Sequence, residues 1–278
     1  MKRIKPWFGI LLVGVGLFIG TEQVLRFTGN PNVFPTVVLL GAFVIPITFI
    51  AYFYEHVRHR EISLPLLTTC FIVGGVVGLI VAGVLEYGTL QTVNFGGLVA
   101  ISVIEECAKL LFPLYMYIRW QYRHEADGLL FGIAAGMGFA ALETMGYAVV
   151  SFIQSRGDIN TLQQVLLVRG FLSPAGHAAW TGFVCAVLWR ARERAGRATI
   201  NLAVIAAFLA AVTLHTLWNL DNSAQTTTSG QLTMVILGNI AIAAVSLTLV
   251  IRRYVEARKA AAALPRPSAN PHEKPAAG

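Results

Sequence analysis

Long apolar stretches, each about the length of a membrane-spanning helix, follow one another along most of the chain. A helix needs roughly 20 mostly apolar residues to cross the hydrocarbon core of a bilayer. We therefore predict an all-α, polytopic transmembrane helical bundle within residues 1–251. Its expected spans, about eight in number, are residues 6–25, 33–54, 64–85, 95–118, 126–153, 164–189, 199–218 and 231–251.

The composition agrees with this pattern. Hydrophobic residues make up 56% of the chain and charged residues only 13%, whereas a soluble domain is typically about 25% charged. A net charge of +7 would suggest a nucleic-acid partner in a soluble protein, but here the loops between spans account for it. We therefore expect a lipid bilayer, and no nucleic acid, as a partner.

Basic residues collect in alternate loops of this map. Most of the 21 lysines and arginines precede the first span or follow the second, fourth, sixth and eighth spans. Loops rich in lysine and arginine stay in the cytoplasm, so both termini are predicted to be cytoplasmic. Residues 252–278 are basic and end in a segment rich in proline and alanine, which predicts a disordered cytoplasmic tail.

Several polar groups interrupt the apolar spans. An ionisable side chain near the middle of a bilayer costs at least about 2.5–3.5 kcal/mol on insertion scales, and such residues often mark a functional site. We expect the long side chain of Arg169 to reach the outer membrane surface with its guanidinium group. We expect Glu86 to be a solvated residue at the end of a span. The remaining groups are Glu105, Glu106, Lys109, Glu143, His177, His215 and Asn219.

The span map places these groups at related depths. Glu105 lies roughly 15 Å below the outer end of its helix, and the groups on the next three spans fall in the middle or outer half of the membrane. We therefore expect them to converge on one cavity. Glu105 and Lys109, four residues apart, share a helix face and can pair. Pro174 removes a backbone hydrogen bond and should bend its span near His177.

This set of side chains suits two kinds of chemistry. A buried carboxylate can activate water as a general base, a histidine can share that work or bind a metal, and an asparagine amide can stabilise an oxyanion. The chain has no GxSxG or HExxH pattern, which argues against the serine and zincin peptidase classes. Peptide hydrolysis by a glutamate-activated water, with or without zinc, and proton- or cation-coupled transport both remain open from these residues.

Four motifs in order carry a resemblance. The segments "EECAK" (105–109), "FAALE" (139–143), His177 in mid-helix and "HTLWN" (215–219) resemble the EExxK, FxxxE and HxxxD/N motifs of the PrsW family of intramembrane proteases. The similarity covers roughly residues 95–220, and that family resembles the wider CAAX-protease and bacteriocin-processing superfamily. This sequence has Asn219 where aspartate is common in PrsW proteins.

The resemblance implies a multi-pass protein of the bacterial inner membrane that cuts a membrane protein or membrane-tethered peptide. An anti-sigma factor cleaved at its first site is the best-known kind of substrate. By the same resemblance, Glu105 is the expected general base and Glu106 supports it. Glu143 and His177 would position water, and His215 with Asn219 would stabilise the oxyanion. The cofactor is either none or zinc, which Glu143, His177 and His215 would then hold.

Overall fold

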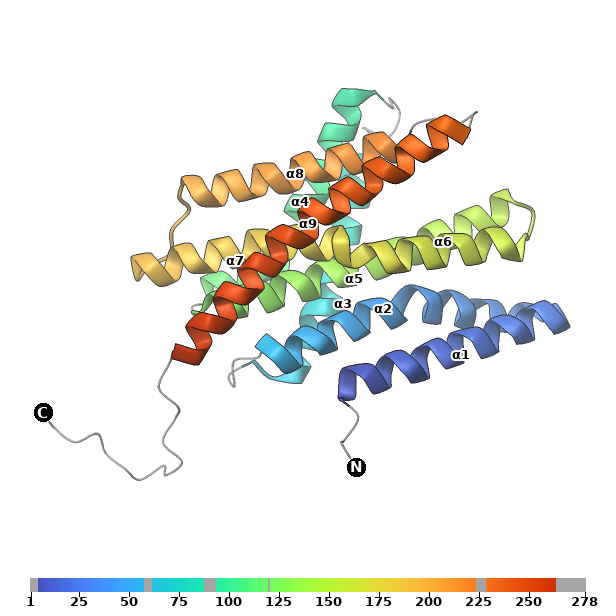
Figure 1. The fold of residues 1–278 in the computed structure, drawn as a ribbon, viewed down its shortest axis with the longest axis horizontal. Helices are drawn as coiled ribbons and strands as arrows, with labels where there is room; N and C mark the ends of the chain where they lie inside the picture. Colours follow the sequence, from blue (N-terminus) through green and yellow to red (C-terminus); the bar gives the residue numbers. More distant parts are fainter. Residues whose placement is uncertain (1–4, 58–61, 88–93, 120, 224–228, 264–278) are drawn as a thin grey trace, which may run out of the picture.

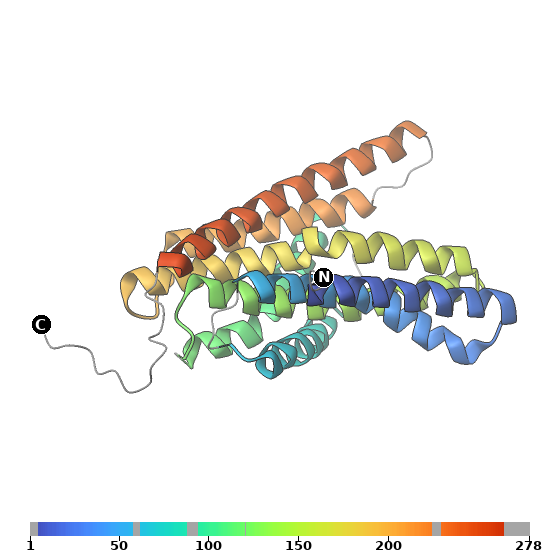
Figure 2. The same ribbon diagram turned by 60° about the horizontal axis from the view of Figure 1, so that its bottom comes forward.

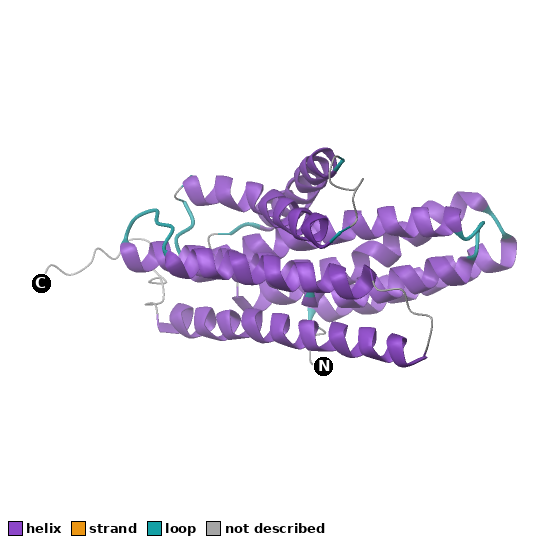
Figure 3. Cartoon of the chain, turned by 90° about the horizontal axis from the view of Figure 1, so that it is seen from above, coloured by secondary structure: helices purple, strands orange, loops and turns teal. Residues whose placement is uncertain are grey.

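The computed structural model describes residues 5–57, 62–87, 94–119, 121–223 and 229–263, and these residues form helices joined by short connections (Figure 1, Figure 3). Two of the segments, η1 and η2, are single turns of 3-10 helix. The elements are α1 (Pro6–Thr28), η1 (Pro31–Val33), α2 (Phe34–Val57), α3 (Leu64–Glu86), α4 (Phe95–Ile118), α5 (Glu125–Gln154), α6 (Ile159–Leu172), η2 (Ser173–Ala175), α7 (His177–Ala195), α8 (Leu202–Ser223) and α9 (Ser229–Ala263).

The predicted all-α transmembrane bundle is confirmed. Seven stretches of the described chain are long and apolar enough to cross a membrane, and one of them joins α6, η2 and α7. α4 has 24 residues but is not among these seven, because Glu105, Glu106 and Lys109 place three charged groups in its middle. With α4 included, each of the expected spans overlaps at least one of these helices.

α5 occupies the centre of the bundle. Every residue from Glu125 to Ala141 is buried, and α5 packs against α2, α3, α4, α6, α7 and α9. Figures 1 and 2 show α9 outermost, crossing obliquely over α7 and α8. A helix that is apolar or small-sided on all faces is suited to such a central position.

Small residues set the distance between α5 and α7. Gly128, Gly132 and Gly136 recur every four residues on one face of α5. A Cβ added at these glycines would lie 2.5–2.6 Å from carbonyl oxygens of Cys185, Thr181 and His177, respectively. Glycines at this spacing allow two membrane helices to approach backbone to backbone. The contact at Gly136 also fixes the position of the first residue of α7.

The sixth span is interrupted, as the proline predicts. α6 ends at Leu172, the 3-10 turn Ser173–Ala175 contains Pro174, and Gly176 takes φ −102° and ψ −111° before α7 begins. Proline cannot donate to a helical ladder, so the break falls at this position. As a result His177 is the first residue of a helix that starts within the span.

The prediction of a disordered tail is wrong for residues 252–263, which continue α9. Tyr254 and Ala257 pack into the core with 8% and 1% exposure, and Arg253 pairs with Glu125 of α5. The alanine-rich sequence after Lys259 also favours helix. Residues 264–278 lie outside the described residues, and the cytoplasmic placement of both termini stays a prediction.

Substituting Gly132 by alanine should separate α5 from α7. The new Cβ would meet the Thr181 carbonyl oxygen at 2.5 Å and the Cys185 Cβ at 2.8 Å. Overpacking of this kind typically costs about 1–3 kcal/mol, so thermal unfolding of the purified protein in detergent should shift to a lower temperature. Gly83→Ala in α3 is the matched control, because a Cβ there has no neighbour within 4 Å. Equal unfolding temperatures for the two variants would contradict this packing.

Candidate active site

A buried ammonium group lies at the centre of the polar cluster. Lys109 is fully buried, and its Nζ lies 2.7 Å from Glu106 Oε1 and 3.3 Å from Glu105 Oε2. The same ammonium donates to His177 Nδ1 at 2.7 Å and lies 4.7 Å from the centroid of the Phe139 ring. One cation therefore contacts two carboxylates and an imidazole, which compensates for its removal from water.

α8 brings His215 to the same carboxylates. Its Nδ1 lies 2.9 Å from Glu106 Oε1, and its Nε2 lies 3.5 Å from Glu105 Oε2. Trp180 of α7 stacks on the His215 ring at 4.7 Å and 25°. Because the carboxylate of Glu106 can only accept, Nδ1 is the nitrogen that donates to it, and Nε2 faces Glu105.

Glu143 lies on the other side of His177. Its Oε2 is 3.0 Å from His177 Nε2 and 2.8 Å from Arg169 Nη2. Since Lys109 donates to Nδ1 of His177, the ring proton belongs on Nε2, facing this carboxylate. Glu143 therefore orients the imidazole of His177, as Glu106 orients that of His215.

Arg169 does not extend away from the cluster as expected. It pairs with Glu143, and its guanidinium carbon lies 4.0 Å from the centroid of the Tyr147 ring. The side chain is 27% exposed, so it remains partly accessible while neutralising a carboxylate within the span. An unpaired glutamate at this depth would be costly, and this cost explains the inward contact.

Glu86 is half-buried, and its Oε1 is inaccessible and makes no hydrogen bond with described residues. It is therefore not the freely solvated end residue that the sequence predicted.

Asn219 follows His215 by one turn of α8. Its Nδ2 donates to the Ser102 hydroxyl of α4 at 3.4 Å, and the side chain is half-buried. The amide therefore lies on the face of α8 that meets α4. A long hydrogen bond of this kind leaves the amide able to donate elsewhere.

A small cavity borders the histidine and the tryptophans. Its volume is about 30 Å³, close to the ~30 Å³ that one water occupies in the liquid. The lining comes from α5, α6, η2, α7 and α8, and includes Thr144, Arg169, His177, Trp180 and Trp218. The cavity lies where α7 begins, and the first backbone N–H groups of a helix have no partner within it. A water held here would lie beside an imidazole and beside donors for a developing negative charge.

The described residues that come close enough to hold a metal ion are Glu105, His177 and His215. One ligand atom from each lies within 4.8 Å of the others. Two histidines and a glutamate form a common donor set for catalytic zinc. Histidine ligands usually donate their second N–H to a carboxylate, and Glu106 and Glu143 lie in that position. The glutamate of this group is therefore Glu105, whereas the sequence predicted Glu143. Glu143 lies on the other side of the His177 ring, where it pairs with Arg169.

The side chains of this donor set fit zinc in a second respect. Glu105 is 7% exposed, and its Oε2 makes no hydrogen bond with the described residues. A buried carboxylate oxygen without a hydrogen bond is costly unless it has an additional partner. His177 Nδ1 accepts from Lys109, so a bound metal would replace that contact. The predicted ionisable side chains are thus brought together, and Asn219 lies one turn along α8 with Ser102 as its partner. Of the predicted site residues, His177 alone lines the small cavity. Each residue's role in catalysis stays a prediction.

Comparison with known proteins identifies a family for the chain. A family model described as PrsW family intramembrane metalloprotease matches residues 63–250. The chain belongs to the PrsW family. No curated protein and no solved structure matches it. This PrsW-family protein is accordingly a membrane-embedded peptidase and an integral, multi-pass membrane protein, and its matched region contains every residue of the polar cluster.

Some residues of this PrsW-family site have no distinct signal in the sequence. Arg169, Trp180 and Ser102 contact Glu143, His215 and Asn219, respectively. Trp180 follows His177 by three residues, a spacing that places both on one helix face, and this is the one available hint. The partner of Ser102 depends on how α4 is rotated against α8, which hydropathy does not specify.

Replacing Lys109 by glutamine should strongly destabilise this PrsW-family protein. Removal of the ammonium leaves two buried carboxylates without their shared cation, and breaking such a pair typically costs about 3–5 kcal/mol. The melting temperature in detergent should fall well below that of Arg119→Gln, which removes an exposed cation at the end of the same helix. If both variants unfolded at the wild-type temperature, Lys109 would not be needed to compensate the cluster.

Proposed function

We propose that this protein is an endopeptidase that hydrolyses peptide bonds of membrane proteins or membrane-tethered peptides, using a water activated at Glu105. One observation carries the assignment to Glu105: its buried Oε2 lies together with one ligand atom of each histidine, and its contacts with Lys109 and His215 are long, 3.3 and 3.5 Å. Glu143 Oε2 also lacks a hydrogen bond, but it is held closely by Arg169 and His177 at 2.8 and 3.0 Å. Glu106 is already engaged by Lys109 and His215. Glu105 is therefore the carboxylate with capacity left for a water molecule.

The neighbouring residues take positioning roles in this proposal. Glu106 holds the His215 ring, and Glu143 holds the His177 ring, so that the two imidazoles face the same space. Asn219 serves as a donor to the oxyanion that forms when water adds to the scissile carbonyl. Lys109 keeps the group of carboxylates compensated while the proton of the water is transferred to Glu105 and then to the leaving amine.

The same donor set supports a zinc-assisted form of this chemistry. Glu105, His177 and His215 would hold the ion, and Glu106 and Glu143 would orient the two histidines. When bound, zinc would polarise the attacking water and the scissile carbonyl. The family description as a metalloprotease agrees with this arrangement. Glu105 acts on the attacking water in both forms of the mechanism. Without a metal it would contact the water directly, and with zinc it would act as a ligand of the ion.

The setting of the reaction follows from the resemblance and the loop charges. We place the protein in the bacterial inner membrane with both termini in the cytoplasm, and an anti-sigma factor is a substrate of the expected kind. Family membership favours proteolysis over proton- or cation-coupled transport, the alternative raised by the buried carboxylates alone.

Glu105→Gln should abolish cleavage while the protein stays folded. Glutamine keeps the shape of the side chain but cannot accept the proton of water, and loss of a general base costs about 100-fold or more in rate. Cleavage of a membrane-tethered reporter in proteoliposomes gives the rate, and the melting temperature reports folding. Glu22→Gln is the matched control, because Glu22 is also buried but pairs with Arg26 on α1. Wild-type cleavage by Glu105→Gln would refute the assignment.

Removal of divalent metal should decide how Glu105 acts. We expect a chelator to suppress cleavage and added zinc to restore it, because three converging donors match a zinc site. Zinc content measured on the purified protein should fall in His215→Gln relative to wild type, independently of activity. Full activity at zero bound zinc would instead assign water activation to the Glu105 carboxylate alone.

A further inference from the structure

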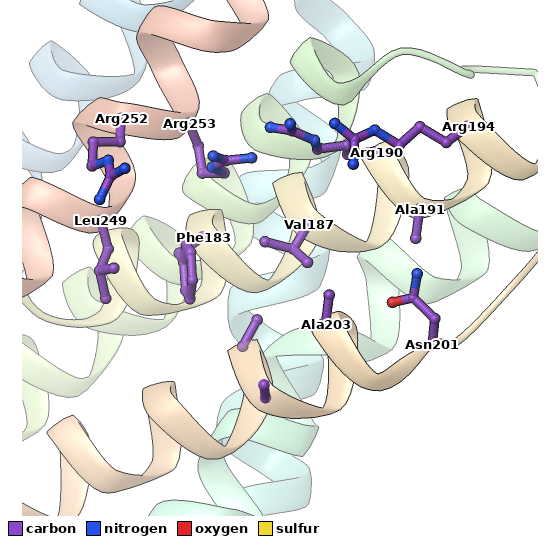
Figure 4. A pocket seen from close by; sticks show the side chains of 12 residues that line it. Phe183, Val187, Arg190, Ala191, Arg194, Asn201, Ala203, Leu249, Arg252 and Arg253 are labelled. Carbon is purple, nitrogen blue, oxygen red and sulfur yellow. The ribbon is translucent and has the colours of Figure 1, made fainter.

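A second cavity, far from the polar cluster, lies between α7, α8 and α9. Its volume is about 500 Å³, within the roughly 300–1,000 Å³ usual for ligand pockets. Figure 4 shows arginine side chains along one edge of this groove and apolar side chains beneath them. The lining residues used below are Phe183, Val187, Arg190 and Arg194 of α7, Ala203, Ala206 and Ala207 of α8, and Leu249, Arg252 and Arg253 of α9.

The groove exists because α8 and α9 separate. Near the end of α8, the amide of Asn222 donates to Asn239 of α9 at 3.1 Å, and a Cβ added to Gly238 would lie 2.7 Å from Asp221 Oδ2. From this junction the two helices diverge toward the start of α8 (Figure 1). Three alanines line the groove from α8, and their short side chains leave the space between the helices open.

Two helices change from apolar to cationic along the groove at the same level. On α7, Phe183, Val187, Arg190 and Arg194 follow a spacing of four, three and four residues, which places them on one face. On α9, Leu249 is followed one turn later by Arg252 and Arg253. The groove therefore has an apolar part within the bundle and a cationic rim where α7 ends.

Two of the four arginines are already neutralised, and two are not. Arg190 and Arg253 both pair with Glu256 and with Glu125. Within the described parts of the chain, Arg194 and Arg252 form no ion pair. Both of these side chains are exposed. The rim thus offers two guanidinium groups that form no ion pair with described residues, and of the two Arg252 also lies within electrostatic range of Glu256.

We propose that this groove binds an anionic phospholipid, with its phosphate on Arg194 and Arg252 and one acyl chain along the alanine-lined face of α8. Guanidinium groups bind phosphate oxygens through paired hydrogen bonds. Basic pockets between transmembrane helices are suited to anionic headgroups. The proposal concerns a site separate from the one that cleaves peptides.

The shape of the groove distinguishes a lipid from a free phosphate ion. Ala203 and Ala206 are exposed on α8, a helix that is long and apolar enough to span the membrane, so this side of the groove opens to the bilayer. An inorganic phosphate would use the rim and leave the apolar part empty. A phospholipid would fill both parts, and its headgroup would lie at the level where the helices end.

Native mass spectrometry of the full-length protein in detergent tests this binding. We expect phosphatidylglycerol to remain bound at collision energies that remove phosphatidylcholine. Each arginine near an anionic headgroup contributes about fivefold in affinity, so Arg194→Gln combined with Arg252→Gln should lower retention about 25-fold. The matched control is Arg197→Gln with Lys259→Gln, which removes two exposed cations from nearby positions that do not line the groove.

A second variant separates groove binding from simple charge attraction. Ala203→Trp keeps every arginine but fills the apolar part, and it should also reduce retention of phosphatidylglycerol. Equal retention of both lipids by the wild type, or equal loss in the control pair, would overturn the proposal. So would full retention in Ala203→Trp, or displacement of the lipid by millimolar glycerol phosphate, since either result would indicate a headgroup site without a chain.

Discussion

The ammonium group of Lys109 is the contact on which the arrangement of the site depends. It is completely buried, and it lies within ion-pair distance of both glutamates of its own helix and hydrogen-bonds His177. Removing two carboxylates and an ammonium from water costs several kcal/mol per ion unless each finds partners. The two ion pairs of Lys109 lie within α4 itself. The contacts with His177 and His215 add further partners, and these form only when α4, α7 and α8 lie together.

The position of His177 depends on backbone features rather than on the cluster itself. The break at Ser173–Gly176 starts α7 within the span, and Gly136 lets the carbonyl of His177 approach α5 closely. A continuous helix through Pro174 would rotate His177 relative to Glu143. The interruption of the helix therefore determines the direction in which the imidazole of His177 faces. Irregular backbone at membrane depth is tolerated where it lies inside a protein or lines a cavity, and here it borders the small cavity beside Trp180.

Hydropathy was sufficient to predict the helices, because it reports how each residue partitions between lipid and water. The list of polar residues inside spans predicted the members of the cluster for the same reason. Their pairing was not predictable in this way. Whether Glu143 faces a metal or orients a histidine depends on helix rotation and on Arg169, whose inward contact reverses the expected direction. The helical extension of α9 was missed because Tyr254 and Ala257 pack against the core, a tertiary contact that a basic, low-hydropathy segment does not reveal.

α7 connects the two regions of the protein for which we propose chemical roles. His177 is its first residue, and Arg190 and Arg194 lie near its end, roughly 20 and 25 Å away at 1.5 Å per residue. At that separation no side chain of one region touches the other, so occupation of the groove cannot alter the cluster by direct contact. An influence of lipid on cleavage would have to pass through a shift of α7 against α5. The glycine contacts between these helices leave little freedom for such a shift, since backbone already meets backbone there. The structure thus favours a groove that anchors α8 and α9 to the bilayer, and a peptidase site whose geometry is set independently by the α5–α7 contact.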